Sequence, residues 1–453
     1  MLELTYKRIL IIALPLMFGT FVQSMITITD GAFVSEIGNT AYNAVGQGSL
    51  MYFALFMLCR GLADGAQISI AKLLGEKKDS DIGALLLNAQ VGQLFLSTLI
   101  FIIFLTTANW FIDVTTKTEE LNPAIKEFIQ YRSWGIFFAG LQVSMMAFFI
   151  GLGKTRIILF STVLMAICNI FLDYCLIFGN CGLPELGMKG APIASCISEM
   201  IAFLFLMTYA IKSRSFKVYQ YNLKRKIQSS KILALFQLSY PLMGQGLISL
   251  STWWVFFGLI EHMGPDNLEI AHNIRYMYFI AFIPIFGYAS ATRTYVSNLV
   301  GRKEQHLIPK IQMKIALLSV LSLFLLFHGS LLYPDQLIKI VEHNPNASSE
   351  LLETSADALR FISGSILLFA LAIVPFNSVA ALGKTKTSFL IELVNIIIYL
   401  SFAYFSIKVW QWDIISIWWV EYLYFGGLAI FSLVYLRYYF KQQRAQRTTE
   451  SNI

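Results

Sequence analysis

Polar and acidic side chains stand inside two long apolar runs in the first half of the chain. In QSMITITDGAF, Gln23, Thr27 and Asp30 are spaced by four and then three positions, so a helix would carry them on one face. Asn169 and Asp173 in CNIFLDYCLIF are one turn apart and also share a face. Carboxylate and amide oxygens at this spacing suit a small hard cation or a shared proton. The polar face that includes Asp30 is expected to line a cavity rather than to contact lipid.

Structural interpretations of these residues stay open. Asp30 precedes Gly31 and could cap the outer end of a helix. Asn169 and Asp173 could be a hydrogen-bonded pair that holds two helices together. Ser195 in GAPIASCIS could add a hydroxyl to a cation site, although small residues are also common where helices touch.

Two basic residues also fall within the apolar run at 269–299. The internal repeat described below pairs Arg275 and Arg293 with Ser49 and Gln67, which are uncharged. The two arginines could help to hold a substrate in a cavity, together with Gln23 and Thr27, or they could belong to a stabilising buried network.

Four further acidic residues lie in the apolar runs without a motif that points to a role. Arg60 and Asp64 are one helical turn apart and are expected to neutralise each other. Glu199, Glu392 and Glu421 either face the interior or lie near helix ends. A charged side chain inside a membrane span costs free energy, so each of them needs a partner or a function there.

The composition excludes most classes of protein. Of the 453 residues, 57% are hydrophobic and 13% are charged, whereas soluble domains carry about 25% charged residues. A soluble enzyme, a fibrous protein and a disordered chain are therefore excluded. Crossing a bilayer takes about 20 apolar residues, and the sequence predicts an all-α membrane protein with twelve transmembrane helices. The spans are expected near 9–34, 46–71, 84–108, 125–151, 156–178, 191–211, 231–260, 269–299, 311–332, 357–381, 387–408 and 414–440.

The loops indicate the orientation of the chain in the membrane. Lysine and arginine are concentrated at the N-terminus, in the connector KSRSFKVYQYNLKRKIQSSK, in the loops on the same side and in the tail. By the positive-inside rule both termini are expected in the cytoplasm. The protein is thus predicted to be a multi-pass protein of the cytoplasmic (inner) membrane, in contact with lipid and not with nucleic acid.

The two halves of the chain share motifs at a nearly constant offset. Pro15-Leu16-Met17 recurs in the second half as Pro241-Leu242-Met243, and GLGKTR at 151–156 recurs as ALGKTK at 381–386. Because six spans is an even number, the halves have the same orientation, as in transporters with parallel repeats. We expect a six-helix lobe at 1–211, a cytoplasmic connector at 212–230, a second lobe at 231–440 and a cytoplasmic tail at 441–453. Pro15 removes a backbone hydrogen bond inside the first span and is a candidate hinge.

These motifs resemble the multidrug and toxic compound extrusion (MATE) family over essentially the whole chain. The similarity includes ALPLMFGTFVQSMITITDGAFVSEIG, the loop LLGEKK with its repeat LVGRKE, and GLGKTR with ALGKTK. The resemblance implies two pseudo-symmetric six-helix lobes and an antiporter that exports organic compounds in exchange for Na⁺ or H⁺.

The resemblance also implies roles for particular residues. Asp30, Asn169 and Asp173, with the hydroxyl of Ser195, would form the cation site of the first lobe, and they would be the sodium ligands if the exchanger uses Na⁺. Pro15 would be the point at which the first helix bends. Some members of the family carry acids in the seventh and tenth spans, but Ser249 stands at the seventh-span position here. A cation site of that type is therefore not expected in the second lobe.

We therefore predict a cation-coupled exporter of small organic compounds that works as a monomer, by alternating access, with no cofactor other than the coupling ion. The alternative is a flippase of the same superfamily, for lipid-linked oligosaccharide or phospholipid. An enzyme is not expected, because the five histidines are too far apart in sequence for a local metal motif.

Overall fold

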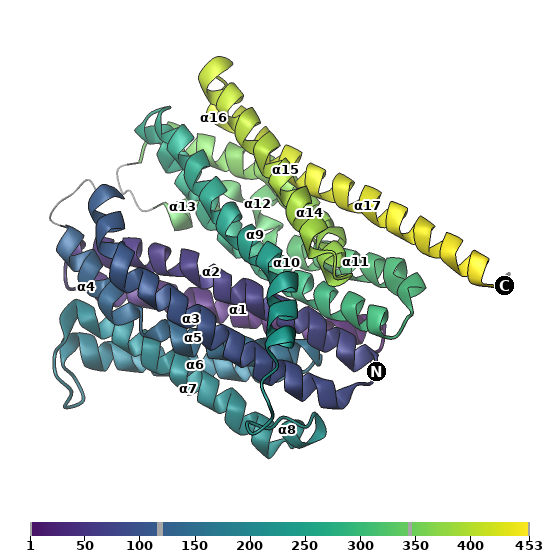
Figure 1. Ribbon diagram of the computed structural model, residues 1–453. Coiled ribbons are helices and arrows are strands. Elements are labelled where there is room, and N and C mark those ends of the chain that lie inside the picture. The colour runs from purple at the N-terminus through teal and green to yellow at the C-terminus, as the bar shows by residue number, and fades with distance from the viewer. Residues whose placement is uncertain (1, 116–120, 343–346, 452–453) are drawn as a thin grey trace. The chain divides into compact units, whose positions relative to one another are not determined.

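The computed structural model describes residues 2–115, 121–342 and 347–451, and within these ranges the only regular secondary structure is helical. The long helices are α1 (Tyr6–Ser35), α2 (Asn39–Gly75), α3 (Asp79–Thr115), α4 (Asn122–Arg132), α5 (Gly135–Gly151), α6 (Arg156–Phe178), α7 (Gly190–Lys212), α9 (Ser229–Glu261), α10 (Pro265–Gly301), α11 (Ile308–Phe327), α14 (Ser349–Ala381), α15 (Thr385–Tyr404) and α17 (Trp419–Ser451) (Figure 1). The short ones are α8 (Ser215–Val218), α12 (Gly329–Leu332), α13 (Pro334–Val341) and α16 (Ile414–Ile417).

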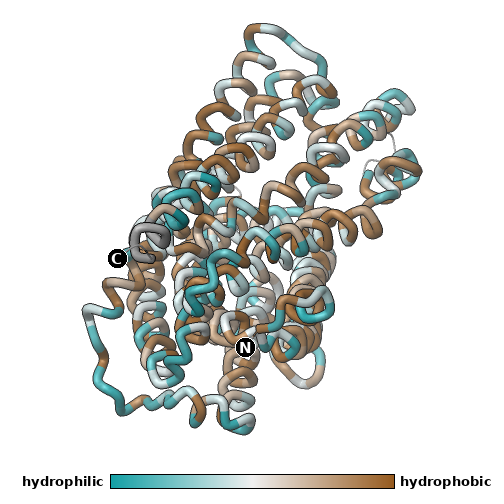
Figure 2. The backbone as a smooth tube through the Cα atoms, turned by 90° about the vertical axis from the view of Figure 1, so that its right-hand side faces the viewer, coloured by the Kyte–Doolittle hydropathy of each residue, from teal (hydrophilic) through white to brown (hydrophobic). Residues whose placement is uncertain are grey.

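The predicted number of membrane spans is confirmed. Within the described ranges, eleven helices are long and apolar enough to cross a bilayer, and α4 with α5 makes a twelfth if that bent pair is one span. Figure 2 shows hydrophobic residues along most of the helices and hydrophilic ones concentrated in the connecting segments. The span expected at 125–151 is not one straight helix, because α4 and α5 meet at an angle of 49°.

The last two spans also differ from simple helices. After α15 the chain makes a π-helical turn at Phe405–Val409, and the last span begins with the short helix α16. The helix α17 then continues to Ser451, so the predicted tail at 441–453 is helical as far as it is described.

The chain forms two compact units. The first comprises residues 15–247, in which α2 packs on α3, α4 and α5, and α7 packs on α5 and α6. The second comprises residues 2–14 and 248–453, in which α14 packs on α10, α11, α15 and α17. Both α1 and α9 contribute to each unit. The division into two lobes at 1–211 and 231–440, and their movement against each other, remains a prediction.

The connector expected at 212–230 packs on the first unit. The backbone N–H of Gly83 donates to the carbonyl oxygen of Tyr219 at 3.0 Å, and the guanidinium of Arg225 donates to the carbonyl oxygen of Ser80 at 2.8 Å. These contacts fix the segment against the first turn of α3.

A glycine allows α9 to approach α2 closely. A Cβ atom on Gly61 would lie 2.5 Å from the backbone nitrogen of Met243 and 2.6 Å from its Cα. Real Cβ atoms do not come this close to backbone, so any side chain here would push the first half of α9 away from α2.

We expect Gly61→Ala to destabilise the protein by about 1–3 kcal/mol, the range seen when extra methyl groups are forced into packed interiors. Gly46→Ala is the matched control on the same helix, because a Cβ atom there has no neighbour within 4 Å. Thermal unfolding in detergent should show a lower midpoint for Gly61→Ala and an unchanged or slightly higher one for Gly46→Ala. Equal midpoints would contradict the close approach.

Candidate functional site

Apolar packing between α1 and α6 sets the register of the predicted cation site. Ile26 of α1 packs against Met165 and Ala166 of α6 in one buried cluster. Asp30 lies one turn beyond Ile26, and Asp173 lies two turns beyond Met165, on the same side of its helix. The contact between the helices therefore carries the two acids toward each other.

The structure brings Asp30 and Asp173 together. Their carboxyl groups lie within hydrogen-bonding reach of each other, and Asp173 is 0% exposed. Asn169 is also buried, and neither its amide oxygen nor its amide nitrogen has a hydrogen-bond partner within the described part of the chain. Both oxygens of Asp173 and Oδ1 of Asp30 have no donor there either, apart from a proton that the two facing carboxyl groups could share. The site thus contains oxygen atoms whose bonding capacity is unused.

The structure bears on the two structural interpretations of these residues. The proposed structural pair is wrong, because Asn169 and Asp173 make no hydrogen bond to each other. A capping role for Asp30 is also wrong, since α1 continues to Ser35. A buried polar group without a partner costs free energy, and a bound cation or proton would supply the missing interaction.

Ser195, Gln23 and Thr27 lie in the first unit. Ser195 is half-buried on α7. Its hydroxyl makes no hydrogen bond to the side-chain oxygens of Asp173 or Asn169, or to Oδ1 of Asp30. Gln23 and Thr27 are exposed on α1, where the Thr27 hydroxyl donates to the Gln23 carbonyl oxygen at 3.4 Å. Their predicted roles in a cation site and a substrate cavity remain predictions.

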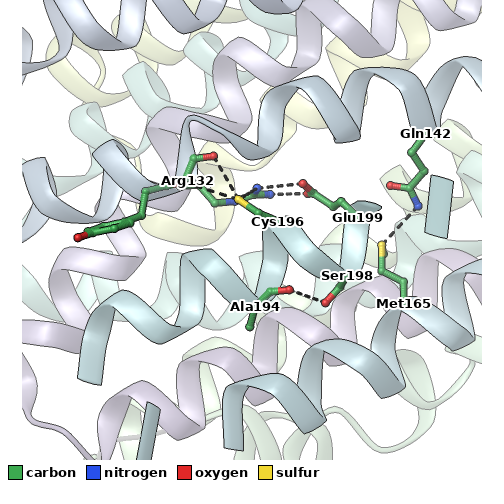
Figure 3. Close-up of polar contacts among 8 residues, drawn as sticks. Arg132, Gln142, Met165, Ala194, Cys196, Ser198 and Glu199 are labelled. Carbon is green, nitrogen blue, oxygen red and sulfur yellow. Dashed lines mark hydrogen bonds and ion pairs between the residues drawn. The ribbon is translucent and has the colours of Figure 1, made fainter. Parts of the chain in front are cut away.

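A buried ion pair lies beside the acid pair. The guanidinium of Arg132, the last residue of α4, donates to both carboxylate oxygens of Glu199 on α7, at 3.0 Å and 2.5 Å (Figure 3). The two side chains are 12% and 14% exposed. The Arg132 guanidinium also lies 3.8 Å from the ring centroid of Tyr52 on α2. Both members of the ion pair act electrostatically on Asp30.

Sequence reasoning did not identify Arg132 or Tyr52. Arg132 falls inside the span expected at 125–151, so the cost of a charge in an apolar run could have pointed to it. Its partner could not have been found in this way, because Arg132 and Glu199 are far apart along the chain. Cys196, whose sulfur lies 3.8 Å from the guanidinium, had no sequence signal at all.

The basic residues predicted to contact substrate lie in the second unit. One guanidinium nitrogen of Arg293 donates to the side-chain oxygen of Asn377 at 2.6 Å. The guanidinium of Arg275 lies 5.2 Å from the ring centroid of Phe257, on which the ring of His272 also stacks. Substrate contact by either arginine remains a prediction.

The charged pair expected on the second span is present in the first unit. The guanidinium of Arg60 lies 3.8 Å from the carboxylate of Asp64, one turn further along α2. The predicted pairing of these two residues is therefore confirmed.

A comparison with known protein families matches one family profile to each half of the chain. The sequence profile of the MatE family matches residues 15–175 and again residues 241–405. The two matches begin at Pro15 and Pro241, where the two copies of the Pro-Leu-Met motif begin. The family profile and the internal repeat therefore divide the chain in the same way.

Relatives and solved structures extend the similarity to nearly the whole chain. A probable multidrug resistance protein NorM from Thermotoga maritima is 23% identical over 416 residues, which cover 91% of this chain and 88% of that protein. A crystal structure of MATE in complex with MaL6 has a TM-score of 0.87 at 17% identity and covers 98% of this chain and 97% of that chain. An outward-facing structure of a multidrug resistance MATE family transporter has a TM-score of 0.85 at 18% identity, with 95% and 94% covered.

The two profile matches, the apolar spans and the repeated halves lead to one conclusion. The chain belongs to the MatE family, the multidrug and toxic compound extrusion transporters whose motifs its sequence resembles.

Proposed function

We propose that this transporter exports organic compounds from the cytoplasm in exchange for Na⁺ or H⁺, which binds at Asp30, Asn169 and Asp173. The observation that carries the proposal is the pair of facing carboxyl groups of Asp30 and Asp173 beside the unbonded amide of Asn169. A polar group in a membrane interior needs a partner or a function, and a transported cation supplies both.

The charge balance around the site favours a cation as the missing partner. Asp30, Asp173 and Glu199 contribute three carboxyl groups, and Arg132 contributes one guanidinium that Glu199 already binds with both oxygens. Two carboxyl groups this close together cannot both ionise without a counter-charge. Protons and sodium would therefore compete for the same oxygens.

A sodium ion at this site would depend on the amide of Asn169. Within the described ranges, no three His, Cys, Asp or Glu residues gather in an arrangement that could hold a metal. The two carboxyl groups with the Asn169 oxygen form a smaller, hard-oxygen set that suits a weakly held, transported ion.

The position of Pro15 supports its role as a hinge. The chain passes from the second unit to the first between Leu14 and Pro15, within the helix α1. The segment before the proline is held by the second unit, where Lys314 donates to the carbonyl oxygen of Leu4 at 2.7 Å. Since proline weakens the helix at this place, rocking of two lobes in alternating access would bend α1 here.

The name of the Thermotoga maritima relative, a probable multidrug resistance protein, favours drug-like substrates over lipid precursors. We place the transporter in the cytoplasmic membrane as a monomer, with both termini in the cytoplasm.

The membrane potential supplies energy for the export. Each elementary charge that enters the cell contributes about 2.3 kcal/mol per 100 mV of membrane potential. At 100 mV this supports roughly a fortyfold concentration gradient of exported compound.

Asp30→Asn and Asp173→Asn are expected to lower cation-driven dye efflux from reconstituted vesicles by between ten- and a hundredfold, because each removes an oxygen charge from the coupling site. The assay imposes Na⁺ and pH gradients separately and thereby identifies the coupling ion. Glu36→Gln is the matched control, since Glu36 is an exposed acid just after α1. Full efflux in both aspartate variants would disprove the proposed site.

The ion pair beside the site is expected to be needed for folding rather than for coupling. Arg132→Gln leaves Glu199 buried without its partner, which costs about 3–5 kcal/mol. The double variant Arg132→Gln/Glu199→Gln should recover most of that stability, because no unpaired charge remains. Folded yield and thermal midpoint in detergent measure both effects. A single variant that is as stable as the wild type would contradict the burial of the pair.

A further inference from the structure

Two glutamates are buried in the second unit and do not belong to the site described above. Glu392 on α15 is 6% exposed and Glu421 on α17 is 1% exposed. Neither belongs to the seventh or tenth span, where the family resemblance looks for acids. The proposed exchange at Asp30 and Asp173 uses neither residue, so their burial has no explanation so far.

Hydroxyl groups donate hydrogen bonds to both carboxyl groups. The hydroxyl of Ser249 on α9 donates to Oε1 of Glu392 at 2.5 Å, and the hydroxyl of Tyr424 donates to the same oxygen at 3.0 Å. The hydroxyl of Tyr399 donates to Oε1 of Glu421 at 3.0 Å. These contacts join side chains from three helices of the second unit.

The two acids are the ends of one cluster. The rings of Tyr399 and Tyr424 lie 5.6 Å apart in an edge-to-face contact. Tyr399, which binds Glu421, is therefore in contact with Tyr424, which binds Glu392. We name Ser249, Glu392, Tyr424, Tyr399 and Glu421 the carboxyl–tyrosine cluster.

No cation faces this cluster within the described residues. From α10, Tyr278 acts on Glu421 and Tyr399, and its hydroxyl is bonded to Ser365 of α14. Tyr422 on α17 donates its hydroxyl to a backbone carbonyl instead. The groups that act on the two glutamates are hydroxyls, and no Lys, Arg or His is among them.

A buried carboxyl group without a cation becomes stable by taking up a proton. A metal ion would need several further oxygen ligands, and the described residues form no metal-binding group of three acids, histidines or cysteines. The hydroxyls orient each carboxyl group through Oε1, which leaves Oε2 to carry the proton.

We propose that the carboxyl–tyrosine cluster is a second proton-binding site, contained within the second unit and distinct from the Asp30–Asp173 pair. Glu392 and Glu421 are its proton acceptors. Ser249, Tyr424 and Tyr399 are positioning residues that favour the charged form when the proton leaves.

The position of the cluster in the internal repeat agrees with this inference. Tyr399 is the counterpart of Asn169 at the offset that relates GLGKTR to ALGKTK, and thus the fifth span to the eleventh. One member of the cluster therefore stands where the first half has Asn169, whereas Asp173 corresponds to Ala403.

Infrared difference spectroscopy of the full-length protein in lipid nanodiscs, without substrate, tests the proposal directly. The parent protein is Asp30→Asn/Asp173→Asn, so the signal does not depend on the first site or on transport. Raising the pH should remove carbonyl-stretch bands of protonated carboxyl groups, and Glu392→Gln and Glu421→Gln should each lack one of them. Glu353→Gln, an exposed acid on α14, is the matched control and should leave the bands unchanged.

Tyr424→Phe keeps the acid and removes one donor, and thus covers the case in which a glutamine variant does not fold. Its titration should move to higher pH, because a hydroxyl that stabilises the charged form has been lost. The proposal is overturned if the glutamine variants show the same bands as their parent, or if Tyr424→Phe leaves the titration in place. It is also overturned if Na⁺ or Mg²⁺ removes the bands at constant pH.

Discussion

The cost of holding charge away from water governs the polar sites of this protein. On the insertion scale a charged side chain at the centre of a span costs about 2.5–3.5 kcal/mol. Arg132 and Glu199 offset this cost by pairing at 2.5 Å and 3.0 Å. Glu392 is stabilised by hydroxyl donors, and Asp173 faces the carboxyl group of Asp30 and has no other hydrogen-bond partner among the described residues. The first arrangement holds two helices together, and the other two are the proton site and the cation site that we propose.

The number of spans could be predicted from the sequence because it follows from local composition. A run of about 20 apolar residues is a property of the chain itself, and so is a repeated motif such as Pro15-Leu16-Met17. The grouping of helices into compact units could not be predicted, because it depends on contacts between distant segments. The first half of α9 belongs to the first unit because Gly61 lets the backbone of Met243 approach α2.

The candidate site could be predicted only in part. Spacing places Asn169 and Asp173 on one helical face, and the resemblance to the family groups them with Asp30. Spacing within a helix carries no information about which helix lies opposite. The pairing of Arg132 with Glu199, and of Glu421 with Tyr399, therefore appears only when the helices are packed.

The internal repeat explains how one scaffold supports both an acid pair and an aromatic interior. At the repeat offsets, Asp30 corresponds to Phe256 and Asn169 corresponds to Tyr399. The rings of Phe256 and Tyr399 touch in the second unit, with centroids 5.3 Å apart. Equivalent helices thus meet at equivalent places, but an apolar ring replaces the carboxylate of the first half. In the second unit the acid comes from a further helix, since Glu421 of α17 accepts a hydrogen bond from the Tyr399 hydroxyl.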